Sequence, residues 1–467
     1  MMKLGTLSAL LATALAGEQT TIAMQGNMVS LMSLKEANHD KQEAAGMFAE
    51  NRYKAMGATP CVNGKAGEYS CQNVNLKAFL PHQDMGSKTR AGNDIWGWTS
   101  DDGREFAIVG QTDGSAFVEV LPDGQAKYVG RLPTQTGNAI WRDMKVIDHH
   151  VYIGSESDDH GLQIFDLTKL LSVGSEPKEF STKTDLTALY TGFGSSHNIV
   201  ADTETKTIYA VGASKNASCP DSNGGLIMLD VADAANPKLL GCAGDDGYVH
   251  DAQCMVYRGY DARYKGHDIC IAFDETKLAI MDVSNKTSPV ILSRTYYDGF
   301  DNKGAYTHQG WTVDAEMRYL LLDDELDEQM RRDAGQDTHT TTYIFDISDL
   351  TKPRWTGQYK SPVRSIDHNQ YVHKGVSYQA NYASGLRVVD VSGIPADPTG
   401  KNMRELAHFD CYPDDDENPQ PEFNGAWSVY PYFKSGTVVL NCIERGFFAL
   451  KVDLGNTTET LTASKTV

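Results

Sequence analysis

The chain of 467 residues has few cations, no long hydrophobic run and none of the common catalytic motifs. Lysine and arginine number 42 against 62 aspartates and glutamates, a net charge of -20. This balance argues against nucleic acid and anionic membranes as partners, because both attract clustered cations. No stretch approaches the roughly 20 apolar residues of a membrane-spanning helix. The sequence contains no nucleophile elbow, metalloprotease helix, phosphate loop or dinucleotide fingerprint, so we expect no nucleotide cofactor.

The eight cysteines include no CxxC pair of the kind that holds zinc, which leaves disulfide bonds as their expected role. We base the pairing on sequence proximity and on short loops within single structural units, although other connectivities remain open. The predicted bonds are Cys61–Cys71, Cys219–Cys242, Cys254–Cys270 and Cys411–Cys442.

The N-terminus has the pattern of a secretory signal. A short positive start is followed by an apolar stretch, and small residues precede Gly17, so we predict a signal peptide over residues 1–16. Residues 456–467 form a polar tail without an apolar anchor. The protein is therefore expected to be secreted and extracellular. Sequons for N-glycosylation begin at Asn216, Asn285 and Asn456.

A short apolar strand that ends in an acidic residue recurs along the chain. The clear copies are Leu162–Asp166, Leu226–Asp230, Leu278–Asp282, Thr342–Asp346 and Leu386–Asp390, and weaker copies are Ala116–Val120 and Phe447–Lys451. Seven units at a spacing of about 40–60 residues are typical of the four-stranded blades of a β-propeller. The acidic residues at the strand ends are expected to cap the turns that follow.

The seventh copy lacks an outer strand, because the chain turns polar at Gly455. A matching segment, Val74–Leu80, precedes the first unit and is predicted to supply the missing strand. The sequence thus predicts an all-β fold, a seven-bladed β-propeller over residues 73–455 that this N-terminal strand closes into a ring. Residues 17–72 are predicted to form a leader, with helical spacing of apolar residues over 24–60 and a loop between Cys61 and Cys71.

One position of the inner strand carries histidine or tryptophan in every unit. Its members are Trp96, Trp141, His197, His250, His308, His368 and Trp427. If inner strands line a central channel, the four histidines converge, and imidazole binds divalent transition metals. We predict a metal site from these histidines with Gln309. The alternative is that the histidines are structural hydrogen-bonding groups.

Acidic residues add a second candidate for cation binding. Asp323, Asp324 and Glu325 belong to the densest acidic run and are a candidate calcium site, with a solvated loop as the alternative. Carboxylates that follow the second strands can also add oxygen ligands near the histidines: Glu156, Asp274, Asp324, Glu325 and Glu444. Arg142 and Tyr306 are the weak candidates for a catalytic base beside the histidine cluster.

Several segments are more distinctive than the strands. They are Asn93–Trp98, Trp141–Asp143, Gly192–Ile199, Tyr248–Cys254, Tyr306–Trp311 and Leu322–Glu328. Together they resemble the LVIVD-repeat, choice-of-anchor B family of secreted proteins, from about Cys61 to Leu454. The resemblance implies a β-propeller, export and, often, attachment to the cell surface. The C-terminus departs from the family because it has no sorting or anchoring segment, and the family assigns no activity to particular residues.

Two functions remain open at this point. The favoured one is a secreted binding or scaffold propeller that presents a surface to an extracellular glycan or protein, with any bound metal structural. The alternative is a metal-dependent extracellular enzyme, a lyase or hydrolase of acidic polysaccharide. There the metal neutralises a uronate carboxylate and eases proton abstraction. The sequence leaves the oligomeric state open.

Overall fold

The computed structural model describes residues 31–214, 219–297 and 305–455. The chain divides into two compact units, residues 1–47 and 48–467. In the first unit, residues 31–44 are helical. The helix predicted over 24–60 is therefore too long at its C-terminal end. Gly46 has a φ of 73°, a left-handed conformation that ends a helix, and the chain beyond it forms turns and isolated bridges.

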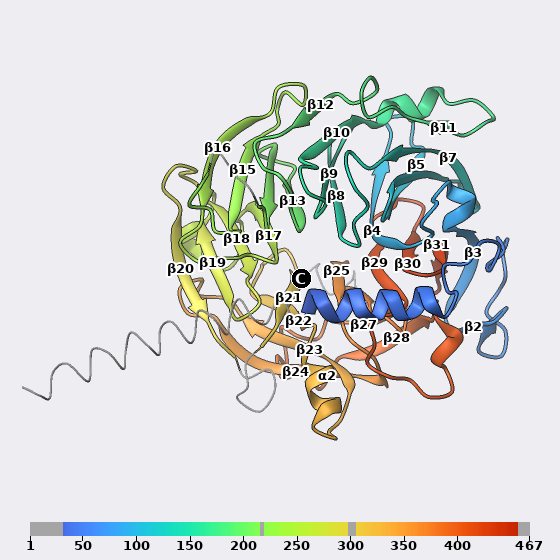
Figure 1. The fold of residues 1–467 in the computed structure, drawn as a ribbon. Coiled ribbons are helices and arrows are strands. Elements are labelled where there is room, and N and C mark those ends of the chain that lie inside the picture. The colour runs from blue at the N-terminus through green and yellow to red at the C-terminus, as the bar shows by residue number, and fades with distance from the viewer. Residues whose placement is uncertain (1–30, 215–218, 298–304, 456–467) are drawn as a thin grey trace, which may run out of the picture. The chain divides into compact units, whose positions relative to one another are not determined.

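The second unit is a seven-bladed β-propeller, as the repeats predict (Figure 1). Blade 1 contains β4 (Gly92–Thr99), β5 (Glu105–Gln111), β6 (Gly114–Val120) and β7 (Ala126–Pro133). Blade 2 contains β8 (Arg142–Ile147), β9 (His150–Ser155), β10 (Leu162–Asp166) and β12 (Ala188–Tyr190). Blade 3 contains β13 (Asn198–Asp202), β14 (Thr207–Val211), β15 (Leu226–Asp230) and β16 (Lys238–Ala243). Blade 4 contains β17 (Asp251–Val256), β18 (Asp268–Phe273), β19 (Leu278–Asp282) and β20 (Val290–Thr295).

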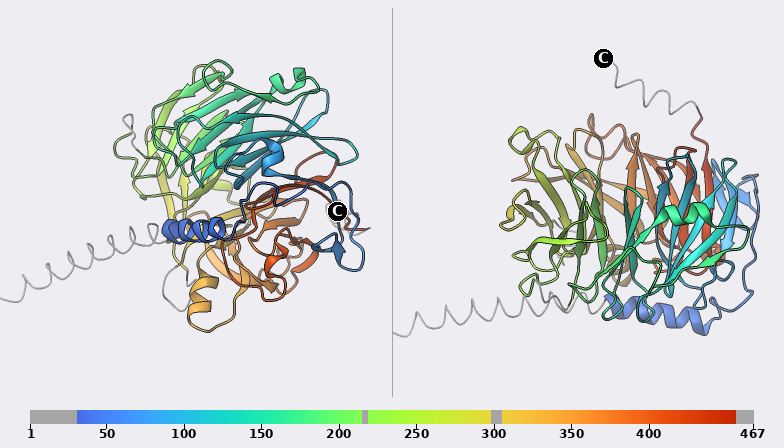
Figure 2. Two further views of the ribbon diagram at one scale, coloured as in Figure 1. Left: turned by 45° about the vertical axis from the view of Figure 1, so that its right-hand side comes forward. Right: turned by 90° about the horizontal axis from the view of Figure 1, so that it is seen from above.

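The remaining blades repeat this order of strands, from the centre of the ring outward. Blade 5 contains β21 (Thr307–Thr312), β22 (Tyr319–Asp324), β23 (His339–Asp346) and β24 (Arg354–Arg364). Blade 6 contains β25 (Asn369–His373), β26 (Val376–Ala380), β27 (Leu386–Asp390) and β28 (Arg404–Phe409). Blade 7 contains β29 (Ala426–Tyr430), β30 (Thr437–Cys442), β31 (Gly446–Val452) and β3 (Val74–Pro81). Figure 2 shows the same blades from two further directions.

Short elements extend or connect the blades. Strand β11 (Lys178–Glu179) adds to blade 1 in parallel with β7, and β2 (Tyr69–Gln72) with β1 (Lys65–Ala66) extends blade 6 from β28. The short helices are η1 (His82–Met85), η2 (Leu167–Ser172), η3 (Ala262–Tyr264), α2 (Asp327–Asp333) and η4 (Pro413–Asp415). No helix among the described residues is long and apolar enough to cross a membrane.

The ring closes through its N-terminal strand, as predicted from Val74–Leu80. Strand β3 pairs antiparallel with β31 from Val74 opposite Val452 to Pro81 opposite Gly446. Phe79 of β3 stacks on Phe448 of β31 with ring centroids 4.5 Å apart. Closure gives β31 a partner on both sides, so blade 7 presents no unpaired strand edge where the chain ends.

Burial between blades explains why each third strand is apolar, and the acidic residue at its end has a local role. These side chains accept a hydrogen bond from the backbone N–H two residues further on, which confirms the prediction that they cap turns. The residues are Asp166, Asp230, Asp282, Asp346 and Asp390. Between blades 1 and 2, the rings of Phe117 and Phe165 stack at 5.1 Å.

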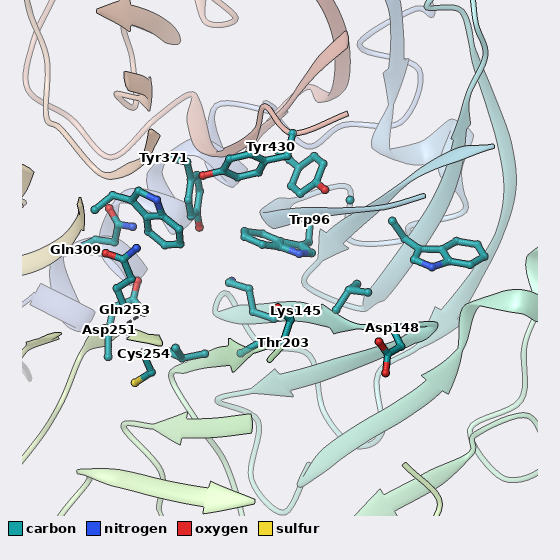
Figure 3. A pocket seen from close by; sticks show the side chains of 18 of the residues that line it. Trp96, Lys145, Asp148, Thr203, Asp251, Gln253, Cys254, Gln309, Tyr371 and Tyr430 are labelled. Carbon is teal, nitrogen blue, oxygen red and sulfur yellow. Dashed lines mark hydrogen bonds between the residues drawn. The ribbon is translucent and has the colours of Figure 1, made fainter. Parts of the chain in front are cut away.

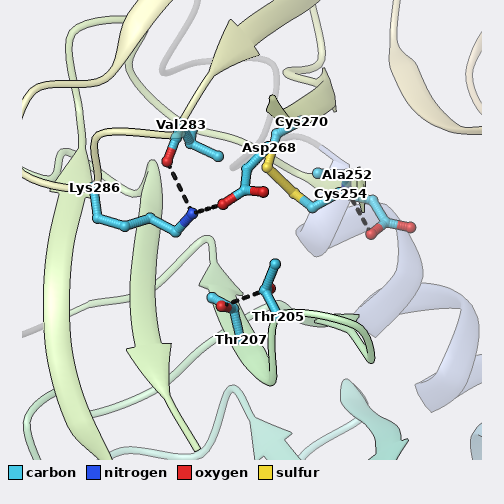
Figure 4. The surroundings of a disulfide bond; sticks show 9 residues. Thr205, Thr207, Ala252, Cys254, Asp268, Cys270, Val283 and Lys286 are labelled. Carbon is cyan, nitrogen blue, oxygen red and sulfur yellow. Dashed lines mark hydrogen bonds and ion pairs between the residues drawn. A yellow bond between two sulfur atoms is a disulfide. The ribbon is translucent and has the colours of Figure 1, made fainter. Parts of the chain in front are cut away.

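The structure joins three of the four predicted cysteine pairs: Cys61–Cys71, Cys219–Cys242 and Cys254–Cys270. The last of these links facing residues of β17 and β18 (Figure 4). The fourth predicted bond, Cys411–Cys442, is not formed, and both residues are buried thiols. Cys411 follows blade 6 and Cys442 ends β30 of blade 7, so sequence proximity within one unit does not apply. Cys442 instead donates its S–H to the carbonyl of Cys411.

Some sequence predictions fall on residues that the structure leaves undescribed. They are the signal peptide over 1–16, the polar tail over 456–467, and the sequons at Asn216 and Asn456. Asn285 is described: it is exposed in the turn between β19 and β20, where its side chain accepts from the N–H of Thr287.

Candidate functional site

The four predicted histidines come together at the centre of the ring. His197, His250 and His368 directly precede inner strands, and His308 lies in β21, so each enters from a different one of the consecutive blades 3–6. Centroids of neighbouring rings are 4.2, 4.3 and 4.4 Å apart. All four residues are at most 8% exposed. Because equivalent positions of consecutive blades meet at the centre of the ring, the four histidines form a cluster.

Hydrogen bonds to the next blade fix three of these rings. The Nδ1 atoms of His250 and His308 lie 3.0 and 3.2 Å from the carbonyl oxygens of His308 and His368. His368 Nδ1 lies 2.6 Å from the carbonyl of Trp427. Because a carbonyl only accepts, each Nδ1 carries the proton, and each Nε2 directs a lone pair away from the backbone. Histidines that bind metals usually donate their other ring N–H in this way.

His197 completes the cluster through a carboxylate. Its Nδ1 lies 2.5 Å from Glu156 Oε1, and its Nε2 lies 2.8 Å from Nε2 of His250. Two ring nitrogens at this distance require a proton or a cation between them, since facing lone pairs repel. Around tetrahedral zinc, ligand nitrogens are separated by about 3.3 Å, given Zn–N bonds of about 2.05 Å. A small rotation of the rings therefore suffices for both to bind one metal ion.

Glu325 adds oxygen atoms to the histidines. Its carboxylate oxygens lie 3.6 Å from His308 Nε2 and 3.4 Å from His368 Nε2, and Tyr382 donates its hydroxyl to Oε1 at 2.6 Å. One ligand atom each from His250, His308 and Glu325 lie within 4.8 Å of one another. A mixed set of imidazole and carboxylate suits zinc and the other divalent transition metals.

Tyr306 belongs to this centre and Arg142 does not. The Tyr306 ring packs edge-on against His250 at 5.8 Å, and its hydroxyl lies 3.2 Å from Glu275 Oε1. Burial raises the pKa of Glu275 to about 7. Arg142 is buried elsewhere, where it donates to the Gln111 carbonyl and Thr134 Oγ1 at 3.1 and 2.7 Å. Its role is to join blades 1 and 2.

The predicted calcium ligands do not come together. Asp323 accepts from Gln370 Nε2 at 2.8 Å, whereas Asp324 accepts from the backbone N–H of Tyr306 at 3.1 Å. Glu325 turns to the histidines. Strand β22 ends at Asp324, so three consecutive side chains leave the backbone in different directions. The calcium site is therefore wrong as a set of these three residues.

Gln309 also points away from the histidines, because neighbouring side chains of a strand alternate. Its amide accepts from the N–H of Gln370 and donates to the Gln370 carbonyl, both at 3.1 Å, and so ties β21 to β25. Among the carboxylates predicted as additional ligands, Glu156 and Glu325 contact histidines. Asp274 pairs with Lys277, and Glu444 accepts from the N–H of Gly425.

A second feature of the inner strands is a pocket of about 380 Å³ lined by aromatic side chains (Figure 3). The rings come from blades 1, 5, 6 and 7 and belong to Trp96, Trp98, Trp311, Tyr371, Tyr430 and Tyr432. In Figure 3, Trp96, Tyr371 and Tyr430 border one side of the pocket, and Asp251, Gln253 and Gln309 lie together at another. The pocket has the size and the apolar lining of a small-molecule site.

The sequence carries a signal for this pocket in the spacing of its aromatic residues. Trp311, Tyr371 and Tyr430 follow the inner-strand residues His308, His368 and Trp427 by three positions. Trp96 belongs to this second ring, and the histidine position of blade 1 is filled by Asn93, three residues earlier. The bulge between Gly92 and Ile95 in β4 has counterparts at His308 in β21 and at Trp427 in β29.

Lys145 provides the positive charge of the pocket. Its Nζ lies 4.6 Å from the centre of the Trp96 ring, 2.7 Å from Asp143 and 3.4 Å from Asp94. Burial disfavours the charged amine, but the two carboxylates outweigh it and hold the pKa of Lys145 well above its usual value. Burial also raises the pKa of Asp251, on the pocket wall, to about 7.

A family model and a solved structure are each similar to part of the chain. A family model of the LVIVD repeat matches residues 265–297, which cover β18 to β20. No curated protein matches the chain. Among solved structures, the chain is similar to the β-propeller domain of Cps50 (Swd1) from Myceliophteria thermophila, with 10% identity and a TM-score of 0.45, over 77% of this chain and 95% of that chain. The sheet topology makes the protein a seven-bladed β-propeller, and its blade 4 contains the match to the LVIVD repeat.

Proposed function

We propose that the protein is an extracellular binding propeller whose ligand enters the aromatic pocket. The observation that carries this proposal is the convergence of aromatic rings from four blades on a hollow of about 380 Å³. Export is supported by the three disulfides, since such bonds persist in oxidising compartments. The resemblance to the choice-of-anchor B family points the same way.

The charge of the pocket favours a neutral carbohydrate as the ligand. Lys145 is already paired with Asp143 and Asp94, and Asp251 adds a further acid to the wall. An anionic ligand would meet this excess of carboxylates, whereas a neutral sugar places its C–H faces on aromatic rings and its hydroxyls near Lys145 and Asp251.

The test is binding of neutral oligosaccharides to the wild type and to Trp311→Ala, measured by calorimetry after a glycan-array screen. Trp355→Ala is the matched control, because Trp355 is 44% exposed on outer strand β24. We expect the Trp311 variant to lose binding and the control to retain it. Absence of any glycan ligand, or equal binding by both variants, would overturn the proposal.

We also infer that the histidine centre holds a divalent transition metal. The support is the set of Nδ1–H···O=C bonds that aim the Nε2 atoms of His250, His308 and His368 at one region, beside Glu325. Elemental mass spectrometry should find about one metal ion per chain in the wild type and little in the double variant His250→Ala/His308→Ala. His267→Ala, altered outside the centre, should keep the metal. A metal-free wild type would make these histidines structural.

A metal-dependent enzyme is the second candidate, and the Tyr306–Glu275 pair beside His250 favours it. A tyrosine and a carboxylate next to a Lewis acid are suited to proton transfer. The assay is turnover of uronate-containing polysaccharides by the metal-loaded protein. Loss of activity in Tyr306→Phe with unchanged metal content would support an enzyme, and an inactive wild type would exclude this substrate class.

A further inference from the structure

A second acidic cluster lies outside the histidine centre. It combines Asp327 and Glu328 of helix α2 with Asp367, which precedes strand β25 by two residues. One carboxylate oxygen from each of the three lies within 4.8 Å of the others. None of the three residues is more than 1% exposed. Three carboxyl groups are therefore held together away from water.

Polar partners satisfy only part of this cluster. Tyr343 donates its hydroxyl to Asp327 Oδ2 at 2.6 Å, and the N–H of Thr341 donates to Glu328 Oε1 at 2.8 Å. The other oxygen of each carboxylate has no hydrogen-bond partner in the part of the chain that the structure describes. Among the described residues no N–H or hydroxyl donates to either oxygen of Asp367, whose carboxyl contacts that of Asp323, although the side chain is fully buried. A buried carboxylate without a donor is costly unless a proton or a cation neutralises it.

The charges around the cluster do not balance. Arg331 contacts Asp327 at 2.8 Å and Glu328 at 3.7 Å. Against this guanidinium stand the three clustered carboxyls and the buried side chains of Asp323 and Asp324, both 1% exposed. Burial and the neighbouring carboxyls of Glu328 and Asp323 raise the pKa of Asp367 well above its usual value. The site thus has an excess of buried acids that needs positive charge.

We propose that Asp327, Glu328 and Asp367 bind a calcium ion. The donors are all oxygen, the choice of hard divalent cations. Two oxygens that share one ion at a Ca–O distance of about 2.4 Å lie no more than about 4.8 Å apart, and every pair of these three oxygens meets that condition. Three carboxylates supply up to six oxygens, within the coordination range of calcium. The six-residue segment 323–328 then links this ion to Glu325 in the histidine centre.

The competing explanation is that protons, not calcium, neutralise the cluster. In that case Asp323 and Asp367 share a proton across their contact, and the wild type gains nothing from calcium. The two explanations differ in the metal content of the folded protein and in the response of its stability to calcium.

The experiment compares the wild type with Asp367→Asn. Each full-length protein is equilibrated with calcium, passed through a desalting column and analysed by elemental mass spectrometry, and its thermal midpoint is measured in calcium and in chelator. We expect the wild type to retain one more calcium per chain than the variant and to melt a few degrees higher in calcium. Asp410→Asn, a buried aspartate outside the cluster, should behave like the wild type.

Equal calcium content and equal midpoints in the wild type and Asp367→Asn would overturn the proposal. If Asp367→Asn fails to fold, terbium luminescence of the wild type decides, because Tyr343 contacts Asp327 and transfers energy to a lanthanide bound there. Calcium-displaceable terbium emission excited through tyrosine, reduced in Glu328→Gln, supports the site. Its absence from the wild type overturns it.

Discussion

Buried imidazoles are held in two different ways in this protein. In the histidine centre three of the four rings donate to a carbonyl of the next blade, so the neighbouring blade sets their orientation. His160, in blade 2, donates its Nδ1 proton to the Gly161 carbonyl, and its Nε2 accepts from Arg142 at 3.0 Å. Burial and the adjacent guanidinium lower the pKa of His160 to about 3. A neutral His160 is therefore part of the folded state.

The pH dependence of stability should report this residue. The unfolded chain binds a proton at His160 near pH 6.5, whereas the folded chain resists protonation down to about pH 3. His160 therefore stabilises the folded state fully above pH 6.5. This stabilisation is lost progressively as the pH falls from 6.5 to about 3. Between pH 7.5 and pH 4.5, urea unfolding should show a loss about 3 kcal/mol larger for the wild type than for His160→Gln. Equal losses would contradict the assignment.

The two buried thiols make a simpler prediction. Denatured, unreduced protein should show two reactive thiols per chain by colorimetric titration, and native protein should show almost none, because Cys411 and Cys442 are buried. The variant Cys411→Ser should show one. A denatured chain without thiols would restore the Cys411–Cys442 bond predicted from the sequence.

At the scale of elements, the closing strand β3 is the one on which the stability of blade 7 depends. Strand β3 is separated from β31 by almost the whole chain, yet it is buried on the same face as its neighbours. Its side chains contribute to the core cluster that also contains Tyr69, Phe409 and Phe448. Blade 7 therefore depends on a strand that comes from the start of the propeller.

Removing one ring from this strand should destabilise the propeller. Phe79 is 1% exposed and stacks on Phe448, so Phe79→Ala removes apolar contacts and leaves a cavity. We expect a loss of about 3–5 kcal/mol in the free energy of unfolding, measured with urea. Val290→Ala on outer strand β20, where Val290 is 54% exposed, should change it by less than about 0.5 kcal/mol. A small effect at Phe79 would mean that β3 is dispensable.

The blades, the closing strand and the gathering of four histidines could be predicted from the sequence, because they follow from apolar strands at a regular spacing. The parts that could not be predicted depend on local departures from that regularity. Trp96 stands three residues beyond the histidine position of its blade and so lines the pocket, and the end of β22 at Asp324 sends Asp323, Asp324 and Glu325 in different directions. The aromatic pocket forms only when inner strands of separate blades meet.

At the scale of the whole molecule, buried acids set the response to alkaline conditions. Burial raises the pKa of Asp274 to about 8 and that of Asp410 to about 7. A carboxyl whose pKa is higher in the folded chain than in the unfolded chain stabilises the fold at low pH. That stability is lost as the pH rises from about 4 to the folded value.

The protein should therefore lose stability between pH 6.5 and pH 8.5. We expect Asp274→Asn to show a loss about 2 kcal/mol smaller than the wild type over this interval, by urea unfolding in chelator. Asp233→Asn, an exposed aspartate with a lowered pKa, is the control and should follow the wild type. If the free energy of unfolding changes with pH in the same way in all three proteins, Asp274 does not cause the loss of stability.

Ring closure by β3 also determines when folding can finish. The strand that pairs with β31 precedes all the other strands of the ring in the chain, whereas β31 follows them. During synthesis, β3 emerges first and its partner emerges hundreds of residues later. The first six blades can form in order of synthesis before β3 has its partner β31 to pair with. The last step of folding then joins the two ends of the propeller.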